Sequence, residues 1–130
     1  MSELKRAENA QSLAAEYGFD WPNVLGIFEK IREEMNEVSA ELNENCPEKI
    51  QGELGDLLFS VVNLCRFLAV DADTALSQAT NKFTQRFEHV LPSLEKGSSY
   101  SLKTLETLWQ QAKHDMERAN GNGDNGKTGD

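Results

Sequence analysis

The spacing of hydrophobic residues is helical along almost the whole chain, and strand signals are almost absent. An amphipathic segment runs from about Glu3 to Tyr17 and stops at Gly18. A second segment runs from about Pro22 to Asn45, with the proline opening it. Its large apolar side chains fall within an arc about 100° wide, so we expect this helix to bury one face only. These side chains are Val24, Ile27, Phe28, Ile31, Met35, Val38 and Leu42.

The third segment, from about Pro47 to Val70, has a different pattern. Between Leu54 and Ala69 it is apolar nearly all round, as is typical of a helix buried in the middle of a bundle. Because short loops join such helices to their neighbours, the pattern predicts an all-α fold, an antiparallel helical bundle.

Two further helices complete the predicted domain. One is capped by Asp71 or Asp73 and runs to about Leu91, and the other follows Ser101 and runs from Leu102 to about Ala119. We therefore predict a single domain over residues 1–119. Residues 120–130 contain no apolar side chain. Such a segment cannot offset its ordering entropy, so we predict a disordered tail.

The chain of 130 residues carries a net charge of −9. This charge repels nucleic acid and anionic membranes, so we expect neither as a general partner. It also repels free nucleotides, so a nucleotide enzyme of this charge needs metal ions and a local cationic cluster. Two cysteines and the lack of a secretory signal pattern predict a reduced, cytoplasmic protein.

Acidic residues stand at helical spacing on the second segment. Glu33, Glu34 and Glu37 form an E-E-x-x-E pattern. At about 100° per residue, Glu34 and Glu37 border the apolar arc, while Glu33 lies further out. Taken alone, such acids more often form a solvated face than a site.

The third segment gives a stronger signal. Glu53 and Asp56 form an E-x-x-D pattern and share one polar stripe with Ser60 and Asn63. Two acids one turn apart on an otherwise apolar helix repel each other unless a cation lies between them. Mg²⁺ or Mn²⁺, which prefer oxygen ligands, would meet that need. The alternatives are solvated acids and, for Asn63, a hydrogen-bonded core amide.

Cations and tryptophans supply candidates for substrate contacts. Lys82 and Arg86 lie four residues apart on the fourth helix and could bind phosphates, or could be the snorkelling cations of an amphipathic helix. Trp21 and Trp109 could stack on a base, or could be core or interface aromatics. The sequence contains no phosphate-binding G-x-x-x-x-G-K-S/T loop, no C-x-x-C pair and no H-E-x-x-H motif.

The combined motifs resemble the MazG nucleoside triphosphate pyrophosphohydrolases, a family of the all-α NTP pyrophosphatase superfamily. E-E-x-x-E followed by E-x-x-D is similar to the superfamily signature. More specific similarities occur in the same order along about residues 14–113. They are Gly18-Phe-Asp-Trp-Pro22, Gly55-Asp-Leu-Leu-Phe59, Val62-Asn-Leu-Cys-Arg66, Asn81-Lys-Phe-Thr-Gln-Arg-Phe87 and Leu108-Trp-Gln-Gln-Ala-Lys113.

The resemblance implies a magnesium-dependent hydrolase that converts nucleoside triphosphates to nucleoside monophosphate and pyrophosphate. It also implies a homodimer in which helices of both chains enclose the site. The alternatives are a narrower hydrolase, selective for dUTP or a damaged nucleotide, and a non-catalytic helical regulatory module. The implied roles are catalytic for Glu33 and Glu34; metal-binding for Glu34, Glu37, Glu53 and Asp56; and substrate-binding for Lys82, Arg86, Asn63, Trp21 and Trp109.

Overall fold

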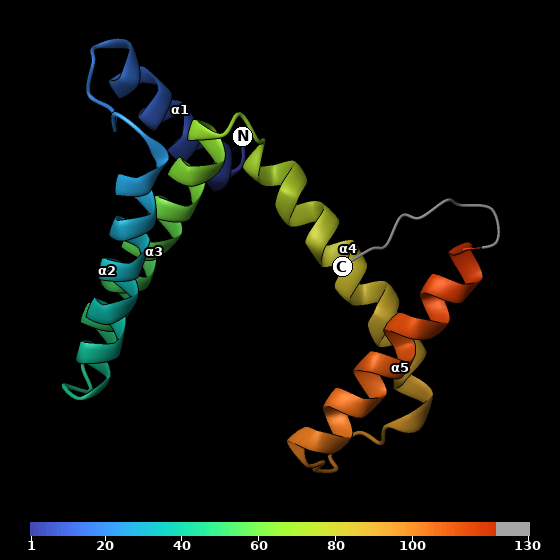
Figure 1. Ribbon diagram of the computed structural model, residues 1–130. Coiled ribbons are helices and arrows are strands. Elements are labelled where there is room, and N and C mark those ends of the chain that lie inside the picture. The colour runs from blue at the N-terminus through green and yellow to red at the C-terminus, as the bar shows by residue number, and fades with distance from the viewer. Residues whose placement is uncertain (122–130) are drawn as a thin grey trace. The chain divides into compact units, whose positions relative to one another are not determined.

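The computed structural model describes residues 1–121, and within them every regular element is helical. The prediction of an all-α fold is therefore confirmed. None of the described helices is long and apolar enough to cross a membrane. The elements, in chain order, are α1 (Glu3–Glu16), α2 (Val24–Leu42), α3 (Pro47–Phe67), α4 (Ala72–Val90), the 3₁₀ turn η1 (Leu91–Ser93) and α5 (Leu102–Gly121) (Figure 1).

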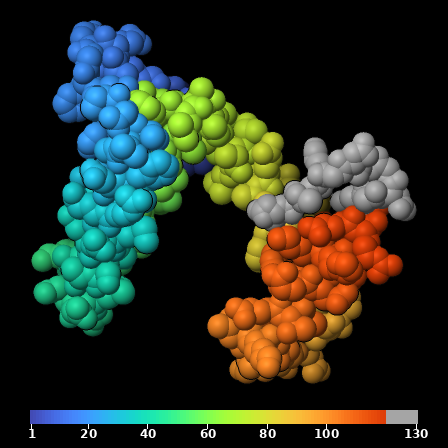
Figure 2. Space-filling view, in the orientation of Figure 1, coloured from blue at the N-terminus to red at the C-terminus, as the bar shows by residue number. Residues whose placement is uncertain are grey.

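The chain forms two compact units, one spanning Met1–Leu76 and the other beginning at Ser77. In the first unit α2 and α3 lie side by side as an antiparallel hairpin, and α1 packs against α3 (Figure 1). The space-filling view shows the outer face of α2, in cyan, along the length of this unit (Figure 2). Ile27 of α2 is only 1% exposed and marks the centre of the packed interior.

The ends of the helices follow from local backbone chemistry. Gly18 adopts a φ of 82°, which glycine tolerates without strain, and Phe19 N–H then donates to the Ala14 carbonyl to close α1. The next helix begins later than predicted. Asn23, rather than Pro22, precedes α2, and its Oδ1 accepts from Leu25 N–H at 2.9 Å. The side-chain cap therefore sets the start of α2.

The third helix ends at Phe67, three residues before the predicted Val70. Ala69 adopts a left-handed φ of 60°, and Val70 N–H donates back to the Cys65 carbonyl at 2.8 Å. This is the same closing geometry as at Gly18, here formed by a residue with a Cβ. The apolar pattern did not indicate the end of α3, because the residue with the left-handed φ is an alanine rather than a glycine.

One ion pair ties α1 to the start of α4. Asp71 caps α4 through its Oδ2, which accepts from Thr74 N–H at 2.9 Å, and its Oδ1 accepts from Lys5 Nζ at 3.2 Å. The hydroxyl of Ser2 donates to Asp73 at 2.6 Å. Of the two predicted caps, Asp71 therefore forms the N-cap of α4, while Asp73 binds Ser2 near the N-terminus of the chain.

In the second unit, α4 and α5 meet through aromatic rings. The Trp109 ring centroid lies 5.1 Å from that of Phe83. Ser101 caps α5 as predicted, with Oγ accepting from Thr104 N–H at 3.1 Å. The helix continues to Gly121, two residues beyond its predicted end. The remainder of the predicted tail, residues 122–130, lies outside the described residues.

Within the first unit, α3 is not buried all round as predicted. Helices α1 and α2 pack against it in this unit. Ser60 and Val62 are buried. Several large apolar side chains on the rest of α3 are exposed to solvent: Leu54 (43%), Leu58 (62%), Phe59 (48%), Val61 (41%) and, just after the helix, Leu68 (53%).

Candidate metal centre

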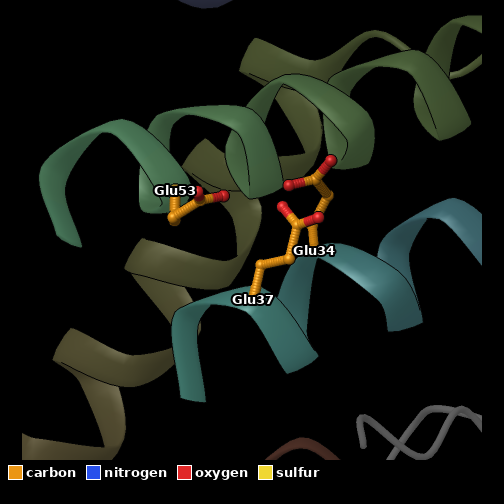
Figure 3. A group of neighbouring side chains, drawn as sticks. All are labelled: Glu34, Glu37 and Glu53. Carbon is orange, nitrogen blue, oxygen red and sulfur yellow. The ribbon is translucent and has the colours of Figure 1, made fainter. Parts of the chain in front are cut away.

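Three glutamates from two helices converge in the first unit. Glu34 and Glu37 come from α2 and Glu53 from α3, and one carboxylate oxygen of each lies within 4.8 Å of the others. Figure 3 shows the three carboxylates turned toward the space between the two helices. The antiparallel hairpin thus brings together residues that are 16 to 19 positions apart in the sequence. Oxygen ligands at this spacing suit a hard divalent cation.

Two buried carboxylate oxygens of the cluster have no hydrogen-bond donor among the described residues. Glu34 is only 3% exposed. Its Oε2 and the Oε2 of Glu53 are buried, and no described residue donates a hydrogen bond to either atom. A buried carboxylate needs a cation or a hydrogen-bond donor, so the two orphaned oxygens fit a metal ion.

Lys30 places a positive charge beside two of the glutamates. Its ammonium lies 3.1 Å from Glu34 Oε1 and 3.2 Å from Glu33 Oε1. The Glu33 side chain is 59% exposed, so this acid stands at the rim of the cluster, as the helical spacing predicted. The pair with Lys30 uses one oxygen of Glu34 and leaves Oε2 available.

Asp56 differs from the other predicted ligands. It lies on α3 one turn after Glu53, but it is exposed and is not one of the three converging carboxylates. Within the first unit it does not lie on a buried stripe as expected, because α1 and α2 leave this position of α3 exposed. Its role as a ligand stays a prediction.

Crowding of the acids changes the titration of Glu37. A hydrogen bond shared with Glu53, together with the negative charges of Glu34 and Glu53, raises the pKa of Glu37 to about 7. Burial and the charge of Glu33 act in the same direction. Near neutral pH the metal-free cluster therefore holds a proton that an isolated glutamate would lose.

This titration predicts a pH-dependent stability of the metal-free protein. Because Glu37 has a higher pKa when folded than its ordinary value of 4.5, the folded state binds more protons between about pH 4.5 and pH 7. The free energy of unfolding should therefore fall as pH rises through that window. Urea unfolding in chelator at pH 5 and pH 8 measures the change.

The matched variant for this prediction is Glu37→Gln, which should flatten the dependence. Asp20 and Asp71 have lowered pKa values, because of hydrogen bonds from Arg66 and Thr74 respectively, so their contributions are lost only below about pH 3.8. They do not overlap with the window of Glu37. An unchanged pH slope in Glu37→Gln would contradict the shared proton.

A cavity of about 500 Å³ lies in the first unit, lined by residues of α1, α2, α3 and the loop between α1 and α2. Two predicted substrate-binding residues, Trp21 and Asn63, line it, and so does Lys30 from the rim of the acid cluster. Trp21 packs directly on α2: a Cβ added at Gly26 would lie 2.6 Å from its Cε3. The absence of a side chain at Gly26 therefore allows the indole to approach the helix this closely.

An ion pair holds the loop that carries Trp21. Arg66 Nη2 lies 2.6 Å from Asp20 Oδ1, and Arg66 Nε donates to Asn63 Oδ1 at 2.8 Å. The Arg66 and Asp20 side chains are 13% and 27% exposed. Two sequence motifs that are far apart in the chain, Gly18–Pro22 and Val62–Arg66, thus meet in one contact.

The other predicted substrate-binding residues belong to the second unit. Arg86 is 9% exposed, and its guanidinium carbon lies 6.0 Å from the Trp109 ring centroid. It is therefore a packed cation rather than a fully solvated one. Lys82 is exposed. Trp109 also lies against Phe83, so within this unit it is a half-buried aromatic at the contact between α4 and α5.

Sequence reasoning missed two residues of the cavity wall. Gln11 is 7% exposed although it is polar. Its signal was its register, because it falls in line with Leu4, Ala7 and Ala14 at helical spacing on the packed side of α1. Asp20 was noted only as part of the Gly18–Pro22 motif, because the sequence around it does not indicate that Arg66 is its partner.

The fold and the cluster define a class of protein: an all-helical domain with a carboxylate-rich candidate metal site between two antiparallel helices. Residues 22–91 match the MazG nucleotide pyrophosphohydrolase domain. The match covers the α2–α3 hairpin with the three converging glutamates, and the chain belongs to this family.

Two relatives are similar over most of the chain. A protein of Thermotoga maritima, named nucleoside triphosphate pyrophosphohydrolase/pyrophosphatase MazG, is 40% identical over 114 residues, which are 85% of this chain and 44% of that protein. The nucleoside triphosphate pyrophosphohydrolase of Escherichia coli K12 is 38% identical over 117 residues, with the same coverage. The chain thus spans less than half the length of these relatives.

Proposed function

We propose that the protein hydrolyses nucleoside triphosphates to nucleoside monophosphate and pyrophosphate. The observation that carries this proposal is the convergence of Glu34, Glu37 and Glu53, with buried oxygens that lack donors, in a chain of the MazG family. In the reaction a water oxygen bonds to the α-phosphorus, the bond to the β-phosphate bridging oxygen breaks, and pyrophosphate leaves.

Glu34, Glu37 and Glu53 are the residues that would hold Mg²⁺, or Mn²⁺, and Asp56 is assigned as a further ligand from the neighbouring turn of α3. When bound, such an ion lowers the pKa of a coordinated water and offsets phosphate charge. The chain's own part is to fix the carboxylates on two packed helices, so that little reorganisation is needed during the reaction. Binding also relieves the repulsion that raises the pKa of Glu37.

Glu33 is assigned to proton transfer or to the metal. Its exposed position at the rim, beside Lys30, leaves it accessible to a water proton. Phosphate contacts are assigned to Lys82 and Arg86, whose N–H groups make charge-assisted hydrogen bonds with phosphate oxygens. Trp21 and Asn63 are assigned to the nucleoside because both line the cavity. Trp109 is assigned to substrate contact through its ring.

The test is pyrophosphate release from each of the common ribo- and deoxyribonucleoside triphosphates. Activity should require Mg²⁺ or Mn²⁺, should disappear in EDTA and should return when the ion is added in excess. Turnover confined to dUTP or to oxidised nucleotides would favour the narrower hydrolase. Absence of pyrophosphate release with every substrate would overturn the proposal in favour of a regulatory module.

We also propose that a second copy of the chain covers α3. Leu54, Leu58, Val61, Cys65 and Leu68 follow one another at spacings of four, three, four and three residues, which aligns them in a seam on one side of the helix. Four of the five are more than 40% exposed. An exposed apolar seam of this kind is typical of a helix that packs against a partner.

Light scattering coupled to size exclusion should give twice the mass of the chain. Leu58→Glu, placed at the centre of the seam, should give a monomer, whereas Leu13→Glu, at an exposed leucine of α1, should leave the mass unchanged. A monomeric wild type would contradict the dimer.

A further inference from the structure

Glu41 lies on the same face of α2 as the converging glutamates but is not one of the three. At about 100° per residue, Glu37 lies at about −60° and Glu41 at about −20° around the helix axis, measured from Glu34. Glu41 therefore falls between the other two in direction, one turn and about 6 Å beyond Glu37. Figure 3 shows Glu34 and Glu37 turned toward the space between α2 and α3. The Glu41 side chain extends from α2 toward the same interhelical face.

The Glu41 carboxylate has a buried oxygen that lacks a donor. Its Oε2 is buried although the residue as a whole is half-buried, and no described residue donates a hydrogen bond to this atom. Glu34 Oε2 and Glu53 Oε2 have the same surroundings, and Glu34 is only 3% exposed. Because a buried carboxylate needs a cation or a donor, Glu41 has the same requirement as the cluster beside it.

The facing turn of α3 does not supply the donor. Glu37 shares a hydrogen bond with Glu53, which sets these two residues opposite each other. Since α2 and α3 run antiparallel, one turn forward from Glu37 faces one turn back from Glu53 (Figure 1). In that turn of α3, Ile50 is half-buried and offers no polar side-chain atom, and its polar neighbours on both sides are exposed.

The position of Glu41 in α2 adds to its need for positive charge. Glu41 is the second-last residue of the helix, where the helix dipole places a partial negative charge. The last turn of α2 contains no basic residue. Lys30 is about three turns away and pairs with Glu33 and Glu34.

One divalent ion does not balance the charge of this group. Lys30 and one such ion supply three positive charges, whereas five glutamates carry five negative charges when ionised. A second divalent ion would bring the two to balance. Side chains four residues apart on a helix have Cβ atoms about 5–6 Å apart, so the carboxylates of Glu37 and Glu41 can reach one ion. The five glutamates are Glu33, Glu34, Glu37, Glu41 and Glu53.

We propose that Glu41 and Glu37 hold a second divalent cation, one turn closer to the tip of the α2–α3 hairpin than the ion of the converging three. Glu37 is shared between the two positions. The inference rests on the proposed function for the assignment of the converging glutamates to a metal. It adds a ligand that lies outside both the E-E-x-x-E and the E-x-x-D pattern. Pairs of divalent cations are typical of enzymes that cleave or transfer phosphates.

Calorimetric titration with Mn²⁺ alone, without nucleotide, tests this inference. Wild type should bind two Mn²⁺ per chain. Glu41→Gln, which keeps the shape of the side chain but loses its charge, should bind one. The matched control is Glu44→Gln, at an exposed glutamate in the turn after α2, and it should bind two.

Binding of one Mn²⁺ per wild-type chain, or of two by a folded Glu41→Gln, overturns the second site. Melting curves in EDTA identify a variant that fails to fold. Glu41→Gln should be at least as stable as wild type under these conditions, because it removes a charge whose oxygen is buried without a donor. Glu41→Met, of similar length and also uncharged, takes its place if it unfolds and should likewise bind one Mn²⁺.

The titration does not involve hydrolysis, so this inference and the proposed function can fail separately. If wild type releases pyrophosphate from no triphosphate while Glu41→Gln binds one Mn²⁺ fewer than wild type, the proposed function fails and the second site stands. If wild type hydrolyses triphosphates in a metal-dependent manner while both proteins bind the same number of Mn²⁺ ions, the second site alone fails.

Discussion

Glu53→Gln should reduce turnover of nucleoside triphosphates by about 10³-fold, the upper range for losing one electrostatic contributor to the transition state. Glu53 is the carboxylate that α3 contributes to the converging three, and without its charge the two acids of α2 remain on one side only. The substitution conserves shape, so the packing of the hairpin is unaffected. Steady-state pyrophosphate release gives the loss, and calorimetric titration with Mn²⁺ should show weaker binding.

The same variant should fold at least as well as wild type in chelator. A glutamine can donate a hydrogen bond to Glu37, which removes the need for the shared proton that raises the Glu37 pKa. Glu29→Gln, at an exposed glutamate of α2 outside the cluster, serves as control and should keep normal turnover. Near-normal activity in Glu53→Gln would exclude this cluster as the catalytic metal site.

Helical content was predictable because periodicity acts over many residues and errors at single positions cancel. The ends of helices were less predictable, since they depend on single backbone angles. Gly18 indicated the end of α1 in the sequence, because glycine readily adopts a left-handed φ. Ala69 adopts a left-handed φ of 60° as well, but an alanine in the sequence does not indicate a turn. Helix α2 begins after Asn23 rather than at the predicted Pro22, because the hydrogen bond from Leu25 N–H to the Asn23 side chain determines where the helix starts.

The burial of α3 could not be read from its sequence. An all-round apolar helix must be covered, but the pattern does not say by which surface. Within the first unit α1 and α2 cover it only in part, and the seam through Leu58 stays exposed. The apolar pattern correctly indicates that α3 needs a covering surface, and the first unit alone does not provide all of it. The exposed seam is the observation that supports our proposal of a second copy as that surface.

The sequence predicted which acids of α2 converge, but not which acid of α3 joins them. Helical spacing placed Glu34 and Glu37 at the edge of the packed face of α2 and Glu33 further out. In the structure, Glu34 and Glu37 belong to the converging cluster and Glu33 lies at its rim. It could not distinguish Glu53 from Asp56, which lie one turn apart on the same helix. That difference depends on the rotation of α3 against α2, a property of packing between helices rather than of either sequence segment.

Arg66→Met should destabilise the first unit and weaken catalysis together. Arg66 holds the α1–α2 loop through Asp20 at 2.6 Å and orients Asn63 at 2.8 Å. Hydrogen bonds to charged groups contribute about 1.5–3 kcal/mol each, so we expect a loss of about 2 kcal/mol in the free energy of unfolding. Methionine keeps much of the apolar stem, so most of the loss reports the guanidinium contacts.

The kinetic effect should appear mainly in KM. Loosening the loop that carries Trp21 changes the cavity but not the carboxylate cluster, so kcat/KM should fall about tenfold with a smaller change in kcat. Arg6→Met is the matched control. Arg6 pairs with Glu3 across side chains that are 73% and 80% exposed, and such a pair contributes little, so stability and kinetics should stay near wild type.

A double-mutant cycle with Asp20→Asn identifies the contact responsible. If the Asp20–Arg66 pair carries the effect, the two substitutions together should cost about as much as Arg66→Met alone, with a coupling energy above about 1 kcal/mol. Additive losses would instead place the effect in the contact with Asn63.

Because Asp20 has its pKa lowered chiefly by the hydrogen bond from Arg66, the wild type should lose this part of its stability as pH falls below about 3.8. Arg66→Met should not, since its Asp20 titrates without the guanidinium, and acid unfolding curves of the two proteins provide the comparison.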